Sequence, residues 1–313
     1  FYFGDTSRLL TFNPGSQTYG SVSWYGSCAS GFALTGTLNM AGTLSFTGGC
    51  PASINGGTIN ATGNISYTGN GSGGTVKVIA NGSTNQTISG SAGGSYAPSL
   101  EIASTGGAVT VSSGINFLAG LKYTSGTVDL SASRIAFNEL GYQNTVIPGN
   151  LLFNDVTWYS DCQGKLAVTG TMQINGTTTM SGGCPVGLPS GKLRMYGNAN
   201  FLRADPNSGV QLEFAGSTAT TVASTINGMP GGNVEVTKTG GGKITLTTKV
   251  AFSGVSQIFT LTSGSVDMAG FNLSMPSLTL NGNTVTRNGG ALSVNGSTVA
   301  AGSQSVYGGT VAP

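Results

Sequence analysis

Short runs of alternating apolar and polar residues recur along the whole chain. In one such run the apolar positions are Leu38, Met40, Leu44 and Phe46, which are separated by even numbers of positions. A period of two places successive side chains on opposite faces of an extended strand. Turn sequences rich in Asn and Gly, such as Asn55-Gly56-Gly57, separate the runs. Because a random coil has no reason to keep this rhythm, the pattern predicts a folded all-β chain.

The chain also contains a long internal duplication. Trp24 and Cys28 return as Trp158 and Cys162, in each case 134 positions later (158 against 24). Further matches at this offset include Thr35-Gly36-Thr37 with Thr169-Gly170-Thr171, and Glu101 with Glu235, and the offset then becomes 138 for Val128-Asp129 and Val266-Asp267. Since rare residues match in register, we predict two homologous repeats, 21–154 and 155–299. An N-terminal segment (1–20) precedes them and a C-terminal tail (300–313) follows.

The spacing of the four cysteines indicates how each repeat is built. Cys50 follows Cys28 at the same interval as Cys184 follows Cys162, namely 22 positions (50 against 28, 184 against 162). A coil of this length is typical of a parallel β-helix, whose rungs lie ~4.8 Å apart, within the distance that a disulfide spans. We therefore predict a right-handed parallel β-helix with disulfides Cys28–Cys50 and Cys162–Cys184, and hence an oxidising, extracellular setting. The alternatives are two β-sandwich domains for the fold, and four buried thiols or a four-cysteine zinc site for the cysteines.

Composition narrows the functions that are compatible with such a fold. The chain has 53 Gly, 12 Lys or Arg, 10 Asp or Glu and no His, and its formal net charge is +2. So little positive charge argues against nucleic acid as a partner, and the lack of His excludes imidazole as a base or a metal ligand. No apolar stretch reaches the ~20 residues that cross a bilayer, so no membrane span is expected. No nucleotide, zinc or nucleophile motif is present either, so we expect no cofactor and no metal.

The acidic residues offer little for catalysis. Asp155 and Asp161 have no acidic counterparts in the first repeat, and Asp205 and Glu213 lie near Arg203, where an ion pair accounts for them. Glycosidases need paired carboxylates, which this pattern does not indicate. We therefore predict that the chain is not an enzyme. A carbohydrate-cleaving β-helix that uses some of these four acids is the alternative.

Two sets of aromatic and aliphatic residues are candidate binding surfaces. The pairs Trp24-Tyr25 and Trp158-Tyr159 can form a platform for sugar rings, but their fixed place beside a cysteine favours a core position for one ring of each pair. The N-terminal segment carries the apolar side chains of Phe1, Phe3, Leu10, Phe12 and Tyr19. This segment is expected either to cap the first rung or to add as a strand to a neighbouring subunit.

Two strand sequences follow a pattern that is found in a known class of proteins. Ser125-Gly126-Thr127-Val128-Asp129-Leu130 and Ser263-Gly264-Ser265-Val266-Asp267-Met268 are each followed by another short strand. This pattern resembles the parallel β-helix surface proteins of bacteria, such as autotransporter passengers and haemagglutinin-like adhesins. The resemblance implies a secreted protein at the cell surface.

We expect a structural subunit of an extracellular filament or a stiff adhesin stalk, which associates with copies of itself end to end or by strand addition. A carbohydrate-binding or carbohydrate-cleaving β-helix is the alternative, and carbohydrate or a host surface is then the partner.

Overall fold

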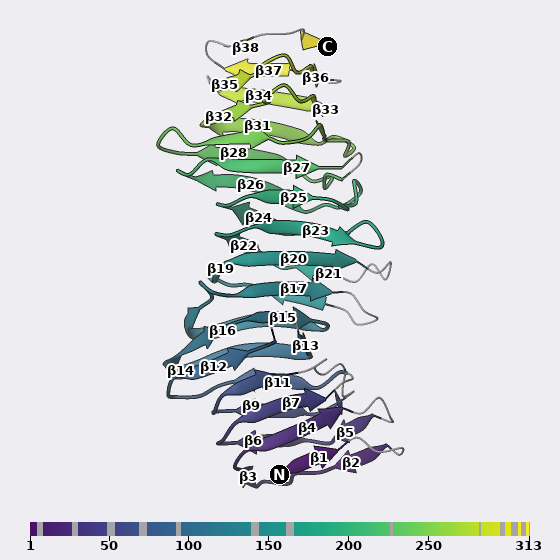
Figure 1. Cartoon of the computed structure of the whole chain (residues 1–313), viewed down its shortest axis with the longest axis vertical. Coiled ribbons are helices and arrows are strands. Elements are labelled where there is room, and N and C mark those ends of the chain that lie inside the picture. The colour runs from purple at the N-terminus through teal and green to yellow at the C-terminus, as the bar shows by residue number, and fades with distance from the viewer. Residues whose placement is uncertain are drawn as a thin grey trace. The chain divides into compact units, whose positions relative to one another are not determined.

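The structure, a computed structural model of the whole chain, is built of β-strands and turns (Figure 1). It describes all residues except 5–8, 27–30, 49–53, 69–73, 92–94, 139–143, 161–165, 226–227, 282, 295–297, 302–305, 308–310 and 313. The described residues contain no helix, and their strands stack in parallel as a β-solenoid of about 12 turns. The prediction of an all-β parallel β-helix is confirmed. The alternative of two β-sandwiches is wrong, because sandwiches are built from antiparallel sheets.

The chain forms two compact units, unit 1 (Phe1–Asn154) and unit 2 (Asp155–Pro313). The strands of unit 1 are β1 (Tyr2–Gly4), β2 (Leu10–Phe12), β3 (Thr18–Tyr19), β4 (Val22–Gly26), β5 (Phe32–Leu34), β6 (Thr37–Met40), β7 (Leu44–Gly48), β8 (Ile54–Asn55), β9 (Thr58–Ala61), β10 (Ile65–Tyr67), β11 (Lys77–Ala80), β12 (Gln86–Ser89), β13 (Ser95–Ala97), β14 (Ser99–Val111), β15 (Gly114–Phe117), β16 (Gly120–Asp129), β17 (Arg134–Asn138), β18 (Asn144–Ile147) and β19 (Leu152–Phe153).

The strands of unit 2 repeat this arrangement with small changes. They are β20 (Asp155–Ser160), β21 (Leu166–Val168), β22 (Thr171–Ile174), β23 (Thr178–Gly182), β24 (Lys192–Met195), β25 (Ala199–Phe201), β26 (Gln211–Gly216), β27 (Thr220–Ser224), β28 (Val234–Lys238), β29 (Lys243–Leu246), β30 (Val250–Ala251), β31 (Ile258–Ser263), β32 (Ser265–Asp267), β33 (Leu273–Met275), β34 (Ser277–Asn281), β35 (Thr284–Thr286), β36 (Leu292–Val294), β37 (Thr298–Ala301), β38 (Val306–Tyr307) and β39 (Val311–Ala312). Strands β6 and β22, and likewise β9 and β24, have first and last residues that are related by the offset of the sequence duplication (171 against 37).

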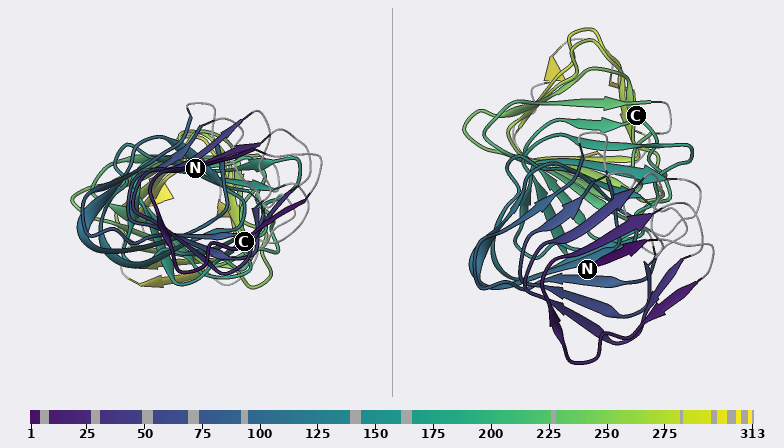
Figure 2. Two further views of the ribbon diagram at one scale, coloured as in Figure 1. Left: turned by 90° about the horizontal axis from the view of Figure 1, so that it is seen from below. Right: turned by 60° about the horizontal axis from the view of Figure 1, so that its bottom comes forward.

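In each unit the strands form parallel columns, one strand per turn. Unit 1 has the columns β1-β4-β7-β10-β12, β3-β6-β9-β11 and β2-β5-β8, and the long strand β14 joins the first two, since it pairs with both β12 and β11. Unit 2 keeps its columns apart, as β20-β23-β25-β27-β29-β32-β35-β38, β22-β24-β26-β28-β31-β34-β37 and β30-β33-β36-β39. The views in Figure 2 show the backbone of successive turns within each unit winding around an interior.

Alternate residues of each strand fill the interior. In unit 1 an aromatic stack runs through successive turns, with ring centroids 5.2 Å apart for Phe3 and Trp24, 5.9 Å for Trp24 and Phe46, and 5.0 Å for Phe46 and Tyr67. Burying these rings supplies much of the apolar area that stabilises a turn. Burial also raises the pKa of the Tyr67 phenol well above its usual value.

Side chains at the corners hold neighbouring turns in register. The Asn64 Oδ1 atom accepts the backbone N–H of Thr87 at 2.8 Å, and its repeat counterpart Asn198 accepts that of Thr221 at 2.9 Å. In both cases an asparagine of one turn supplies the acceptor for a strand amide of the next turn. The period-two pattern and the polar corners together explain why this sequence forms stacked turns.

Candidate functional site

The first turn of unit 1 is a candidate contact face. Its strands β1, β2 and β3 pair in parallel with β4, β5 and β6 of the same chain. Each is the last strand at its end of the sheet, so the backbone groups on its other side have no strand partner among the described residues. The N-terminal segment therefore forms an intramolecular turn, and its outer edge is the kind of surface to which another strand adds.

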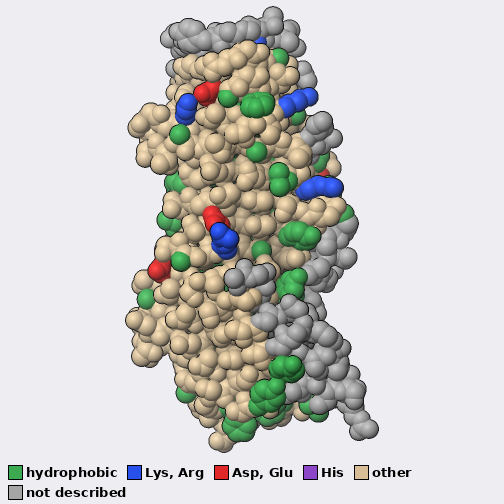
Figure 3. Space-filling model, in the orientation of Figure 1, with side chains coloured by type: hydrophobic (Ala, Val, Ile, Leu, Met, Phe, Trp, Pro, Cys, Tyr) green, Lys and Arg blue, Asp and Glu red, His purple; other side chains and the backbone are tan. Residues whose placement is uncertain are grey.

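Large apolar side chains gather on this turn, at the N-terminal end of the view in Figure 3. Phe1 is 73% exposed, Tyr2 65%, Leu9 61% and Leu10 41%. Large exposed apolar groups on an edge are typical of a contact surface rather than of an end that faces water. Of the five residues expected at a subunit interface, Phe1 and Leu10 thus face solvent.

The other three expected interface residues, Phe3, Phe12 and Tyr19, are half-buried in an aromatic cluster. The ring centroids of Phe3 and Phe12 are 4.9 Å apart, and those of Phe1 and Tyr19 are 5.0 Å apart. These rings lie over Trp24 and Phe32 of the next turn. The cluster therefore covers the core of unit 1 and also supports the exposed edge.

The two Trp-Tyr pairs divide between core and surface. Trp24 and Trp158 are only 2% and 0% exposed, whereas Tyr25 and Tyr159 are 43% and 41% exposed. Successive residues of a strand point to opposite faces, so both rings of a pair cannot lie on one surface. A carbohydrate platform made of both rings is therefore not possible, and only the two tyrosines remain available to a ligand.

The disulfide prediction falls mostly outside the described residues. Cys28, Cys50 and Cys162 are among those whose placement is not described, and Cys184 is not a free cysteine. The pairing Cys28–Cys50 and Cys162–Cys184 stays a prediction.

Three of the four candidate catalytic acids lie in separate places, and Asp161 lies outside the described residues. The Asp155 Oδ1 atom accepts the N–H of Thr177 at 2.8 Å, and Ser21 makes the same bond to Thr43 in unit 1 at 3.1 Å. Asp205 caps a turn by accepting the N–H of Asn207 at 2.9 Å. These contacts are structural bonds of corners and turns.

The expected ion pair of Arg203 with Asp205 or Glu213 is wrong. The Arg203 guanidinium donates to the carbonyl oxygen of Gly183 at 3.3 Å. Glu213 instead lies on the outward side of β26, where Lys192 and Arg194 of β24 donate to its Oε2 atom at 3.1 and 2.9 Å. Thr237 of β28 donates to its other oxygen at 2.9 Å. Burial raises the pKa of Glu213, but these three donors outweigh it and hold the pKa below its usual value.

A matching acidic centre in unit 1 was not foreseen from the sequence. Glu101 on β14 is only 7% exposed and lies between Lys77 of β11 and Lys122 of β16, and Lys122 donates to its Oε1 atom at 3.0 Å. Thr124 donates to the same oxygen at 2.6 Å. Burial raises the pKa of Glu101, but the bonds from Lys77, Thr124 and Lys122 lower it to about 2. The signal in the sequence is a lysine on each of the two strands that flank Glu101: Lys122 lies in register with it, and Lys77 lies two residues before its register partner Ile79.

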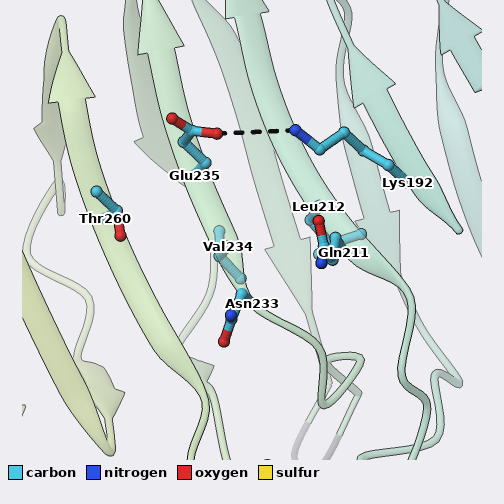
Figure 4. A pocket seen from close by; sticks show the side chains of 7 residues that line it. All are labelled: Lys192, Gln211, Leu212, Asn233, Val234, Glu235 and Thr260. Carbon is cyan, nitrogen blue, oxygen red and sulfur yellow. Dashed lines mark ion pairs between the residues drawn. The ribbon is translucent and has the colours of Figure 1, made fainter. Parts of the chain in front are cut away.

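The repeat counterpart of Glu101 lines a groove on unit 2 (Figure 4). The groove has a volume of about 290 Å³ and is lined by Lys192, Gln211, Leu212, Asn233, Val234, Glu235 and Thr260. The Glu235 side chain is 39% exposed, and its Oε2 atom lies 3.8 Å from the Lys192 ammonium. Its Oε1 atom accepts a hydrogen bond from Thr262 at 3.0 Å. The groove is therefore polar, open and lined by strands β24, β26, β28 and β31.

A buried lysine is a second feature that the sequence pattern missed. Lys238 is 1% exposed, and its ammonium donates to the carbonyl oxygens of Ala215 at 2.8 Å and Thr218 at 3.0 Å. Burial lowers its pKa to about 8. The repeat counterpart is Ser104, whose hydroxyl lies 2.6 Å from the Gly107 carbonyl oxygen. Both side chains satisfy carbonyl groups at a corner.

Comparisons with known proteins identify no relative. No family model matches the chain, and neither the curated proteins nor the solved structures contain a match. Among the described residues there is no group of three or more acidic or cysteine side chains that could hold a metal ion. No helix in the described part of the chain is long and apolar enough to cross a membrane.

Proposed function

We propose that this chain is a structural subunit of an extracellular filament or a stiff surface stalk, which associates with further copies through its first turn. The observation that carries the proposal is the edge formed by β1, β2 and β3, which combines unpaired strand sides with exposed Phe1, Tyr2 and Leu10. A parallel edge with apolar side chains favours the addition of further strands. The stacked core and corner bonds supply the stiffness that such a role needs.

The strand columns support a head-to-tail arrangement. The columns of unit 2 end in β38, β37 and β39, and the columns of unit 1 begin with β1, β3 and β2. The duplication relates β4 to β20 and β6 to β22, so β1 and β3 belong to the same kinds of column as β38 and β37. Two copies stacked head to tail would thus continue their sheets in parallel, and such contacts between unlike surfaces generate open filaments.

The test changes the edge without changing the core. Tyr2→Lys combined with Leu10→Lys places charges on two exposed positions of the first turn, and charged side chains on an edge block strand addition. We expect the unmodified chain to form assemblies that grow with concentration in sedimentation velocity and appear as fibres in negative-stain micrographs. The variant should sediment as a monomer.

Val255→Lys is the matched control, because Val255 is 95% exposed and lies in a turn of unit 2, away from the first turn in sequence. This control should assemble like the unmodified chain. A monomeric unmodified chain at high concentration would refute self-association, and assembly that survives the double substitution would refute the first turn as its contact.

The extracellular setting is proposed on the cysteines and has its own test. Oxidised cysteines are typical of secreted proteins. Peptide mapping without reductant should recover Cys28 linked to Cys50 and Cys162 linked to Cys184. Recovery of alkylated free thiols from the untreated protein would argue against this setting.

A further inference from the structure

We propose that the groove on unit 2 binds a neutral, polyhydroxylated ligand, the chemistry of an oligosaccharide. The groove, defined by Lys192, Gln211, Leu212, Asn233, Val234, Glu235 and Thr260, lies over the four neighbouring strands β24, β26, β28 and β31. The proposal goes beyond self-association, because it concerns the side of unit 2 and not the first turn.

The first argument is the difference between the two repeats. Glu235 corresponds to Glu101, which Lys77 and Lys122 cover from the neighbouring turns. The counterparts of these lysines in unit 2 are Gln211 and Thr260, at offsets of 134 and 138 (211 against 77, 260 against 122). With Gln211 and Thr260 in place of the two lysines, the Glu235 side chain is 39% exposed, against 9% for that of Glu101, although the charged Glu213 lies in register with it on β26. The substitution of both lysines opens the groove at this carboxylate.

The second argument is the free bonding capacity in the groove. Asn233 uses its Oδ1 atom to accept the N–H of Ile258 at 2.9 Å, which leaves its amide nitrogen available. Within the described residues, the side chains of Gln211 and Thr260 have no hydrogen-bond partner, and the Glu235 Oε2 atom has only the Lys192 ammonium at 3.8 Å. These groups include both donors and acceptors, as a ligand rich in hydroxyl groups requires.

The third argument is charge. Lys192 and Arg194 lie beside Glu213 and Glu235, so the cations and carboxylates of this surface balance. A cationic ligand would have to displace Lys192 from between the carboxylates, and an anionic one would approach both carboxylates. A neutral ligand avoids both costs. Its hydroxyl groups can donate to Glu235 and accept from Lys192 and the two amides.

The size of the groove agrees with a short saccharide. Gln211, Asn233 and Thr260 come from three successive turns, which span ~10 Å at the usual spacing of strands. The volume of about 290 Å³ is at the small end of ligand sites. We therefore expect one or two sugar units to be held, with the rest of a longer chain in solvent.

The test is calorimetric titration of the full chain with neutral tetrasaccharides, namely maltotetraose, cellotetraose, chitotetraose and mannotetraose. A heparin tetrasaccharide and spermidine serve as charged comparators. At least one neutral saccharide should bind, and Glu235→Gln should weaken it at least tenfold. Gln211→Lys with Thr260→Lys should abolish binding, because it restores the lysine cover found around Glu101. Since unit 1 already tolerates that pattern, this variant is expected to fold, and circular dichroism checks that it does.

The matched control is Glu101→Gln, which changes the equivalent glutamate in unit 1 and should leave saccharide binding unchanged. The proposal is overturned if none of the four neutral saccharides binds, or if only heparin or spermidine does. It is also overturned if binding persists in the double lysine variant. Each of these outcomes leaves the self-association test untouched, because the substitutions do not alter the first turn.

Discussion

Glu101 of unit 1 and Glu235 of unit 2 occupy the same position of the repeat and meet different surroundings. Glu101 lies under Lys77 and Lys122, whereas Glu235 is half-exposed and its closest ammonium, that of Lys192, is 3.8 Å away. The buried carboxylate of this face in unit 2 is instead Glu213, one turn earlier, held by Lys192 and Arg194. In a stacked fold the turns above and below a residue decide whether it is a structural ion pair or an open polar group.

The largest effect is expected at the corner where Lys238 replaces Ser104. The pKa of Lys238 is about 8 in the folded protein and near 10.5 in the unfolded chain, so protonation favours the unfolded state. The free energy of unfolding should therefore rise by about 3 kcal/mol between about pH 8 and pH 10.5. Urea denaturation across this range measures the rise.

The variant Lys238→Met distinguishes the contribution of Lys238 to this pH dependence from the contributions of other groups that titrate in alkali. The variant keeps most of the side-chain volume and loses the amine, so its unfolding free energy should change less over the same pH range. Equal slopes for the variant and the unmodified protein would show that Lys238 is not desolvated as the structure places it.

Replacing each carboxylate by an amide should lower the unfolding free energy by different amounts for the two glutamates. Glu101→Gln leaves Lys77 and Lys122 beside a neutral group, which should lower the unfolding free energy by about 2 kcal/mol, less than for a fully buried pair because both lysines are partly exposed. Glu235→Gln should cost about 0.5 kcal/mol, as for a surface ion pair. Urea midpoints at neutral pH measure the loss of stability in both variants. Similar losses would contradict the contrast between a buried ion pair at Glu101 and a surface ion pair at Glu235.

Sequence alone predicts much of the fold and little of these polar centres. Period two predicts that Trp24 and Tyr25 point in opposite directions, and the structure places Trp24 inside. The contacts between turns depend on turn length, which varies. Lys192 aligns with Gln211 at an offset of 19 (211 against 192), whereas Val234 aligns with Phe259 at an offset of 25 (259 against 234).

A coil of constant length, as the cysteine spacing suggests, would therefore not bring Lys192 beside Glu213. The register also shifts between Val236 and Thr237, which no local pattern in the sequence marks. The sequence shows the duplication because Trp and Cys are rare and match in register. It does not show that the two missing lysines expose Glu235, because that depends on which residues the neighbouring turns place beside it.

Acid should test the ion pairs of Glu101 in a second way. The folded pKa of Glu101 is about 2, against 4.5 for an unperturbed glutamate, so the unfolded chain takes up the proton first as the pH falls. The stabilisation from Glu101 is complete above about pH 4.5 and is lost towards pH 2. Glu101→Gln should flatten the fall in melting temperature over this range. An equally steep fall in the Glu101 variant would contradict the assigned ion pairs.

A small effect is expected from giving Glu235 the two lysine neighbours of Glu101. Gln211→Lys with Thr260→Lys gives Glu235 the two lysines of Glu101, and should raise the unfolding free energy by about 0.5–1 kcal/mol. Lys77→Gln with Lys122→Thr does the reverse in unit 1, and should lower the unfolding free energy by at least as much as Glu101→Gln, about 2 kcal/mol, because the largely buried Glu101 carboxylate then keeps only the Thr124 hydroxyl. The gain should shrink in high salt, which screens partly exposed charges. If the first pair of substitutions destabilised the protein, the turns flanking Glu235 would differ in more than these two side chains, and the divergence of the two repeats would need another cause.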